Sequence, residues 1–482
     1  MDKELPPYFR YWGKAKKDSE QSGADYHLLP YHCLDVAAVC YEWLDTDTKL
    51  AGELSDYLAI PRDQFKSLMS FFMAMHDLGK FASAFQALYS SDSTKLILTN
   101  SRKSYDGSHY RHDRLGTWFW RKLRQQICER CTEGHGLNRR QLKYLTKPLN
   151  IIMDCMLGHH GVPVELDEPG IEGFTESQNL SASEAFTLDL ITLFQPEFTE
   201  VMIQNDSDWL VKLKQVSWHI AGIAVLCDWI GSDQADFPYV SDEMPLDIYW
   251  QTAKKQAKRA LESKQLIRSF NVAPFLSVEN SFGFSPTPLQ SWAEKVEITD
   301  TPQLFILEDV TGAGKTEAAL TLAHRLMEKG VASGFYFGLP TMATSNAMYK
   351  RVTEHYLSMY ESVAKKPSIV LAHGAREMNP LFQQTVITSG KDNSDYNAED
   401  KTALAECHRW LADSRKKALL APVGVGTIDQ ALLAVLPKRH QSLRLLGLHN
   451  KVLVFDEVHA ADEYMFELLE GLLKLHLHQG GS

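Results

Sequence analysis

The stretch Ala74-Met-His-Asp-Leu-Gly-Lys-Phe81 closes an apolar run, Phe65 to Ala74, in which apolar residues recur at three- and four-residue spacing. This spacing predicts a helix. His76 and Asp77 therefore present an imidazole and a carboxylate side by side, where we expect Gly79 to break the helix. An isolated His-Asp pair more often makes hydrogen bonds at a helix end than binds a metal ion. Its meaning therefore depends on the other groups in the same half of the chain.

Three further groups of suitable chemistry occur in that half: His32, the doublet His159-His160, and Asp228. Imidazole and carboxylate without thiolate suit a divalent manganese, iron, cobalt or nickel ion better than a structural zinc. Two adjacent histidines cannot easily face one ion, which indicates either two ions or one ligand and one phosphate contact. Such ions lower the pKa of water and can hold the oxygens of a phosphodiester. Lys80, one turn beyond the His-Asp pair, could stabilise phosphate charge, although a surface lysine is the alternative.

The pattern stays mostly helical from Tyr31 to about Glu262, and no series of strands is predicted there. Between about Ser263 and Pro288, asparagine, glycine and proline residues punctuate the chain, as expected of an interdomain connection. We therefore predict an all-α domain over residues 1–262 and a linker over residues 263–288.

Residues 289–482 differ from the first half, because short apolar runs alternate with helical segments. Runs that are apolar on both faces are what buried parallel strands require. The predicted strands are Leu304–Leu307, Gly334–Phe337, Ser368–Leu371, Ala418–Ala421 and Lys451–Phe455. This half is therefore predicted to be an α/β domain with a parallel sheet.

The segment Glu308-Asp-Val-Thr-Gly-Ala-Gly-Lys-Thr316 follows a predicted strand and precedes a predicted helix, Glu317 to Glu328. In that context the glycine-rich loop cradles phosphates, the lysine reaches the β and γ phosphates and the last threonine ligates magnesium. Asp309 replaces the usual first glycine, but Thr-Gly-x-Gly-Lys-Thr is the form used by superfamily 2 helicases. We predict that ATP and magnesium are bound by Thr311, Gly312, Gly314, Lys315 and Thr316.

Asp456-Glu-Val-His459 ends a predicted strand, where a P-loop protein needs an acid to hold magnesium. The tetrapeptide resembles the DEAD/DEAH box of superfamily 2, so Asp456 would hold the magnesium and Glu457 would polarise the attacking water. Gln290 similarly resembles the glutamine that contacts adenine, although a solvated linker glutamine is the alternative. Loops after two predicted strands could grip a phosphate backbone without reading bases, through Thr341, Thr427 and Gln430.

With 482 residues, 44% hydrophobic and 23% charged, the chain has the composition of a globular protein with at least two cores. No stretch approaches the roughly 20 uninterrupted apolar residues that span a bilayer, so a membrane role is not supported. A polar amino terminus and seven scattered cysteines suit the cytoplasm. Cys128 and Cys131, with His135 nearby, lack a second ligand pair, so structural zinc is not expected. The net charge of −11 argues against indiscriminate binding of polyanions.

The order of the metal-binding candidates resembles the HD nuclease domain of the type I CRISPR-associated helicase-nuclease. His27-Leu-Leu-Pro-Tyr-His-Cys-Leu-Asp-Val-Ala37 and Ala74–Phe81 are also similar to that family, especially its subtype I-E members. His112, in His112-Asp-Arg-Leu-Gly116, fits the family's middle histidine best, although Asp113 departs from the pattern and His109 is the alternative. The resemblance implies a first ion at His32, His76, Asp77 and Asp228. It implies a second ion at this middle histidine and the doublet His159-His160, with Asp77 as the bridge between the two ions.

By this resemblance the chain is expected to combine a metal-dependent single-stranded DNA nuclease, with His76, Asp77 and Lys80 in its catalytic centre, and the first RecA-like lobe of a 3′–5′ superfamily 2 helicase. Such proteins work with the Cascade surveillance complex in CRISPR type I interference. The resemblance covers about the first half of the family's length, so we expect no second lobe and only weak ATP binding. A nucleotide phosphohydrolase and a docking module with a degenerate metal site are the alternatives.

Overall fold

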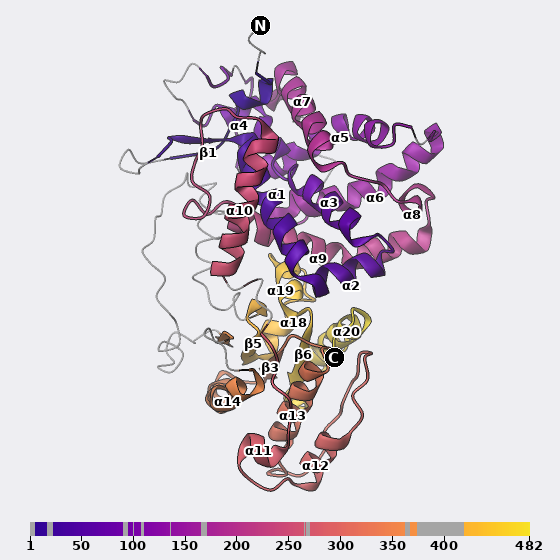
Figure 1. Ribbon diagram of the computed structural model, residues 1–482, viewed down its shortest axis with the longest axis vertical. Coiled ribbons are helices and arrows are strands. Elements are labelled where there is room, and N and C mark those ends of the chain that lie inside the picture. The colour runs from indigo at the N-terminus through magenta and orange to yellow at the C-terminus, as the bar shows by residue number, and fades with distance from the viewer. Residues whose placement is uncertain are drawn as a thin grey trace. The chain divides into compact units, whose positions relative to one another are not determined.

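The computed structural model describes residues 5–16, 23–89, 95–99, 101–107, 110–134, 136–164, 171–264, 266, 270–361, 367–373 and 419–482. The chain forms two compact units, of which the first reaches Ile267 and the second begins at Arg268. In Figure 1 the colours of the first unit start at indigo, and those of the second end at yellow.

The first unit is a helical domain with one small sheet at its amino-terminal end. Its helices are α1 (Leu29–Thr46), α2 (Thr48–Tyr57), α3 (Arg62–Met73), α4 (Ser83–Gln86), α5 (His112–Cys131), α6 (Arg139–Leu157), α7 (Ser177–Phe194), α8 (Glu200–Ile203), α9 (Ser207–Gly231) and α10 (Leu246–Ser263). Strand β1 (Trp12–Ala15) pairs antiparallel with β2 (Tyr26–Leu28). The predicted helical domain is confirmed, but the sheet was missed because its strands of four and three residues are too short to show an alternating pattern.

Helices α1 and α9 form the centre of this unit. Helix α1 packs against α3, α9 and α10, as Figure 1 shows. Gly231 permits the close approach of α9, because a Cβ atom there would lie 2.8 Å from the Cα of Val36. Along α1, Leu34 and Val36 are fully buried, and each such side chain contributes about 1.5–3 kcal/mol to folding. This packing brings the end of α9 against the side of α1.

Helix α9 is long and apolar enough to cross a membrane, judged by length and composition alone. Of its most apolar window, 56% is buried inside the protein. A single helix of this kind is weak evidence for a membrane span, since the core helices of compact domains have the same properties. We interpret α9 as the core helix of the first unit.

The second unit contains a parallel sheet with strand order β4-β5-β3-β6, formed by β3 (Gly334–Leu339), β4 (Ile369–Ala372), β5 (Val423–Thr427) and β6 (Lys451–Phe455). Among the described residues, the helices of this unit are α11 (Val278–Phe282), α12 (Pro288–Lys295), α13 (Lys315–Glu328), α14 (Met342–His355), α18 (Ile428–Leu432), α19 (Gln441–Leu448) and α20 (Glu463–His478). The predicted α/β fold with a parallel sheet is therefore confirmed.

Side chains of the sheet alternate between two apolar layers. Phe335 and Phe337 of β3 pack with α13 and α14 on one face, whereas Tyr336 packs with α18, α19 and α20 on the other. Both faces of the sheet are covered, which explains why its strands read as continuous apolar runs. Because all four strands are parallel, their carboxyl ends share one edge of the sheet.

The strands predicted at Gly334–Phe337, Ser368–Leu371 and Lys451–Phe455 correspond to β3, β4 and β6. The prediction at Ala418–Ala421 was wrong, since the strand is Val423–Thr427. Its glycines weaken the sequence signal but are needed: a Cβ atom on Gly426 would lie 2.2 Å from the carbonyl oxygen of Ala372.

The strand predicted at Leu304–Leu307 is also wrong for the residues that the structure describes. The segment has no ladder partner there, and Ile306 is 77% exposed. The outer edge of β6 meets the chain end, where the Leu453 N–H donates to the Ser482 carbonyl. Gln303 N–H donates to the Ser482 hydroxyl. Among the described residues this apolar run therefore lies outside the sheet.

The stretch predicted as a linker spans the change between the two units. From Asn271 onward its described residues bond to the second unit: the Ala273 N–H donates to the Met359 carbonyl, and the Ala273 carbonyl contacts Nε2 of His324. Helix α11 forms within this stretch, capped by the Ser277 side chain.

Candidate metal centre and phosphate-binding edge

Five segments of the first unit bring the predicted metal-binding side chains together. In three overlapping groups the possible ligand atoms lie within 4.8 Å of one another, and all of the side chains are buried. The predicted alternative His109 lies outside the described residues. The residues are His32 from α1, His76 and Asp77 from the turn after α3, His112 from α5, His159 and His160 from the 3-10 helix η3 (Gly158–His160), and Asp228 from α9.

Gly79 places the His-Asp turn against α5. Helix α3 ends at Met73, so the expectation that Gly79 breaks the helix was wrong. Gly79 instead lies in the 3-10 helix η2 (Leu78–Phe81), where an added Cβ atom would lie 1.7 Å from the His112 carbonyl oxygen and 2.6 Å from the Gly116 nitrogen. The absence of a side chain lets two backbones touch, and this contact sets His112 beside Asp77.

The Asp77 carboxylate lies between two sets of imidazoles. Its Oδ2 atom is 2.9 Å from Nε2 of His32 and 3.2 Å from Nε2 of His76. Its Oδ1 atom is 3.5 Å from Nε2 of His112 and 3.7 Å from Nε2 of His159. One carboxylate therefore offers an oxygen to each side, the geometry that a bridging ligand requires.

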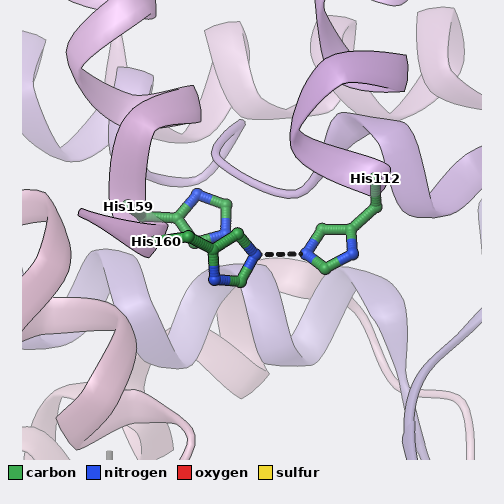
Figure 2. A group of neighbouring side chains, drawn as sticks. All are labelled: His112, His159 and His160. Carbon is green, nitrogen blue, oxygen red and sulfur yellow. Dashed lines mark hydrogen bonds between the residues drawn. The ribbon is translucent and has the colours of Figure 1, made fainter. Parts of the chain in front are cut away.

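His112, His159 and His160 form the group on the Oδ1 side. Figure 2 shows these three imidazoles close together, with Nε2 of His160 2.8 Å from Nε2 of His112. The ring centroids of the adjacent histidines lie 4.1 Å apart. The expectation that neighbouring histidines cannot easily face one point was too strict, because the tight turn of η3, closed by left-handed Gly161, directs both rings to this region.

Main-chain carbonyls orient two of the imidazoles. Nδ1 of His76 lies 2.9 Å from the Met73 carbonyl oxygen, and Nδ1 of His159 lies 2.8 Å from that of Met156. An Nδ1–H that donates to a carbonyl leaves the Nε2 lone pair for a metal ion. On the opposite side the Ser232 hydroxyl donates to Asp228. These contacts hold ligand atoms pointing inward.

Burial and neighbouring charges set different protonation states. Burial disfavours the charged His76 imidazole, but Asp77 and Asp228 outweigh burial and raise the pKa of His76 to about 9. A metal ion that binds His76 must therefore displace a proton at neutral pH. At His112, His159 and His160, burial is the main cause that lowers the pKa below its ordinary value. These three imidazoles are therefore neutral.

Lys80 is buried, which contradicts the alternative of a surface lysine. Its Nζ atom lies 2.8 Å from Oδ2 of Asp77 and donates to the Gly13 carbonyl oxygen 3.1 Å away. Burial opposes ionisation of Asp77, but the charges of Lys80 and His76 hold the pKa of Asp77 well below its ordinary value. Asp77 is therefore ionised before any metal ion arrives.

Several buried atoms of the centre fit a divalent cation. His32 Nδ1 and Asp77 Oδ1 have no hydrogen-bond partner within the described part of the chain. Orphaned donors and acceptors are costly inside a protein, by about 1–3 kcal/mol each, unless a ligand satisfies them. The donor set of imidazole and carboxylate is the one that binds borderline divalent metals. These His and Asp groups could therefore hold a metal ion.

Lys14 of β1 was missed by sequence reasoning. Its positive charge, after burial and Lys80, lowers the pKa of His32, and it also contributes to the low pKa of Asp228. Lys14 belongs to no motif, and only the pairing of β1 with β2 next to α1 brings it near these residues. Sequence alone offers no signal for it.

The predicted P-loop of the second unit has the backbone of a phosphate cradle. Gly312 and Gly314 have φ values of 86° and 83°, the left-handed region that favours glycine, and α13 begins directly afterwards at Lys315. The Lys315 ammonium donates to the carbonyl oxygens of Asp309 and Val310, 2.7 and 3.1 Å away. Thr311 is exposed and Thr316 lies in the first turn of α13.

Gln290 is buried against this loop, so the alternative of a solvated linker glutamine is wrong. Its Nε2 atom donates to the Gly314 carbonyl, and its Oε1 atom accepts from the Thr287 N–H in a capping box. The side chain thus connects the start of α12 to the P-loop. A contact with adenine stays a prediction.

The other predicted residues lie at the carboxyl ends of strands. Thr341 follows β3 and caps α14, Thr427 ends β5, and Asp456 and Glu457 follow β6. Glu457 has a φ of 53°, a conformation that costs a non-glycine residue energy and is concentrated at functional sites. Gln430 lies half-buried in α18. The parallel sheet therefore collects these loops at one edge.

A helical domain with a buried His/Asp centre, joined to a parallel P-loop domain, defines the class of HD-domain proteins fused to helicase-type domains. Residues 12–237 match the family described as Cas3, HD domain, and residues 286–474 match type III restriction enzyme, res subunit.

The relatives agree along nearly the whole chain. The CRISPR-associated endonuclease/helicase Cas3 of Escherichia coli strain K12 is 31% identical over 98% of this chain and 53% of its own length. The solved structure of T. fusca Cas3 with ATP is 25% identical, with a TM-score of 0.72 over 97% of this chain and 48% of that chain. A chain in a CRISPR RNA-guided surveillance complex before nicking is 21% identical, with a TM-score of 0.59 over 96% of this chain and 45% of its own.

The first unit therefore matches the Cas3 HD-domain family, and the chain as a whole is similar to Cas3 proteins while spanning about half the length of the curated relative described above.

Proposed function

We propose that the first unit is a metal-dependent nuclease for single-stranded DNA and that the second unit is the nucleotide-binding lobe of a 3′–5′ superfamily 2 helicase. The observation that supports this most is Asp77, whose two oxygens face separate groups of imidazoles in a chain that also carries a P-loop. A hydrolase of free nucleotides has no use for an attached motor domain, which disfavours that alternative. A buried set of donors around an ionised Asp77 disfavours a degenerate docking module.

The centre would hold two divalent ions, chosen from manganese, iron, cobalt and nickel. His32, His76 and Asp228 would hold one, and His112, His159 and His160 the other, with Asp77 between them. When bound, such ions lower the pKa of water and stabilise the charge of a phosphodiester. Lys80 keeps Asp77 ionised and in place, and the carbonyls of Met73 and Met156 keep two imidazoles aligned.

In the second unit, phosphates would replace the loop carbonyls as partners of Lys315, and Thr316 and Asp456 would hold magnesium. Glu457 would orient water, and Thr311, Gly312 and Gly314 would shape the loop around the phosphates. Gln290 would contact adenine, while Thr341, Thr427 and Gln430 would contact the DNA backbone. The ATP in the related T. fusca structure supports nucleotide binding by this fold.

The biological setting of this proposal is CRISPR type I interference in the cytoplasm, with the Cascade surveillance complex as partner. The presence of the same fold in a surveillance-complex structure supports this assignment. Pull-down of Cascade bound to target DNA would test it, with Cascade lacking target DNA as the control. Equal recovery in both cases would contradict target-dependent recruitment.

Incubation with manganese or nickel separates the candidate activities. We expect the chain to cleave single-stranded DNA, to stop when EDTA removes the metal, and to leave deoxynucleotides and cyclic nucleotides intact. Faster hydrolysis of the free nucleotides would favour the phosphohydrolase alternative. We also expect weak ATP binding without DNA-stimulated turnover, and robust turnover would contradict that part.

A further inference from the structure

Tyr105 contacts His112 at two points. The His112 backbone N–H donates to the Tyr105 hydroxyl oxygen at 3.1 Å, and Nδ1 of the His112 imidazole lies 3.1 Å from the same oxygen. The Phe85 ring packs edge-on against both rings, with centroid distances of 5.5 Å in each case. Tyr105 is therefore held in one position relative to the imidazole.

These contacts decide which nitrogen of His112 can bind a metal ion. Nε2 faces the centre, because it lies near Nε2 of His160 and Oδ1 of Asp77. A lone pair on Nε2 requires the proton to sit on Nδ1, since a neutral imidazole carries one N–H. The Tyr105 oxygen is placed to accept that Nδ1–H.

His112 differs in this respect from two other imidazoles of the centre. His76 and His159 each use a main-chain carbonyl three residues earlier. His112 is the first residue of α5, so its own helix has no preceding turn to supply such a carbonyl. A side chain takes that place, and its contribution can be removed by a substitution.

We propose that Tyr105 is a positioning residue that holds His112 in the metal-binding tautomer, for the ion shared by His112, His159 and His160. The inference rests on the proposed metal function and deepens it. Outer contacts of this kind affect metal affinity about 10- to 100-fold. The effect of Tyr105 would reach the ion only through His112.

The test is Tyr105→Phe in the full chain. Tyr57→Phe is the control, because it also removes a tyrosine hydroxyl, but that hydroxyl of α2 bonds to Gln215 of α9 and not to a histidine of the centre. Calorimetric titration with manganese or nickel alone should show one of two ions bound about 10- to 100-fold more weakly in Tyr105→Phe, with a much smaller change for the ion that shares Asp77, and no change in Tyr57→Phe. Nitrogen-15 spectra of labelled histidines in the metal-free proteins should show an altered His112 tautomer in Tyr105→Phe alone. The phenylalanine ring can keep its contact with Phe85, so the metal-free variant should retain its fold.

If Tyr105→Phe binds both ions with the wild-type affinities and its His112 tautomer is unchanged, Tyr105 does not have this role, although the proposed metal centre is not contradicted. Absence of any bound ion from the wild-type chain would overturn the proposed function itself, and this inference with it.

Discussion

The metal centre of the first unit and the phosphate-binding edge of the second unit differ in how much of each lies inside a core. His76 and Asp77 are 0% and 1% exposed, whereas residues 309–311 of the P-loop are exposed. In the first unit the ligands come from segments that are packed on all sides. In the second unit, loops carry the site, and Lys315 binds its own loop. A buried site is fixed by the fold, whereas an edge site is completed by what binds to it.

Asp77→Asn should produce the largest effect and should be confined to the first unit. The amide removes the charge that both imidazole groups share, so we expect loss of both ions and a fall in DNA cleavage of at least about 100-fold. Metal content and cleavage rate measure this, and binding of a fluorescent ATP analogue should not change. Asp189→Asn, which alters a carboxylate bonded to Tyr8, is the control. Equal loss of ATP binding would break the distinction between the sites.

Gly79→Ala should destabilise the first unit by about 3 kcal/mol, because the new methyl group collides with the backbone of α5. The matched control is Gly52→Ala in α2, where an added Cβ atom meets nothing within 4 Å. That substitution should raise stability by up to about 1 kcal/mol. Thermal unfolding of the metal-free chain measures both. Similar curves for the two variants would show that the centre tolerates movement of α5.

Lys451→Met should stabilise the second unit by about 1–3 kcal/mol at pH 6, because it removes a buried charge. This gain exceeds the cost of leaving the Leu419 carbonyl without its hydrogen-bond donor. Burial lowers the pKa of Lys451 from 10.5 to about 7. Below pH 7 the lysine is charged in both states, and between pH 7 and 10.5 the unfolded chain binds more protons. Stability of the wild-type unit should therefore rise with pH across that window.

Unfolding curves of the second unit at several pH values test this effect of Lys451. The difference between the unfolding midpoints of the wild-type protein and Lys451→Met should change in favour of the wild type between pH 7 and 10. Groups that titrate in both proteins do not affect this difference. Parallel pH profiles for the two proteins would show that Lys451 does not contribute.

Ile306→Ser should have the smallest effect, within about 0.5 kcal/mol, because the side chain is largely exposed in a segment outside the sheet. Leu326→Ala in the same unit is the control, and loss of this buried side chain should cost about 2–5 kcal/mol. Chemical denaturation measures both. A large loss with Ile306→Ser would show that the edge segment is packed like the metal centre.

Residue types made much of both sites predictable from sequence. His32, the His-Asp pair, the histidine doublet and Asp228 stand out because few other roles gather imidazoles and carboxylates in one helical half. The P-loop is local in sequence, so its glycines and Lys315 could be assigned without knowing the fold. Parallel strands were correctly predicted at the continuous apolar runs of β3 and β6, but not at Leu304–Leu307.

What sequence could not predict depends on contacts between distant segments. Gly79 read as a helix breaker, yet its role follows from the backbone of α5. Tyr105 and Lys14 belong to no motif and acquire meaning only through His112 and the pairing of β1. Strand β5 was misplaced because Gly426 lowers strand propensity, although the neighbouring strand leaves no room for a side chain there.

The divided carboxylate of Asp77 has a consequence for metal titrations. In the proposed two-ion centre, each ion would take one oxygen of the same anion, so neither binding event is independent of the other. The first ion would withdraw electron density from the shared carboxylate and would also fix the rotation of that carboxylate. Metal occupancy should therefore not follow the binding curve of two independent sites. Loss of electron density would weaken binding of the second ion and the fixed carboxylate would favour it, so the larger of the two effects sets the sign of the cooperativity.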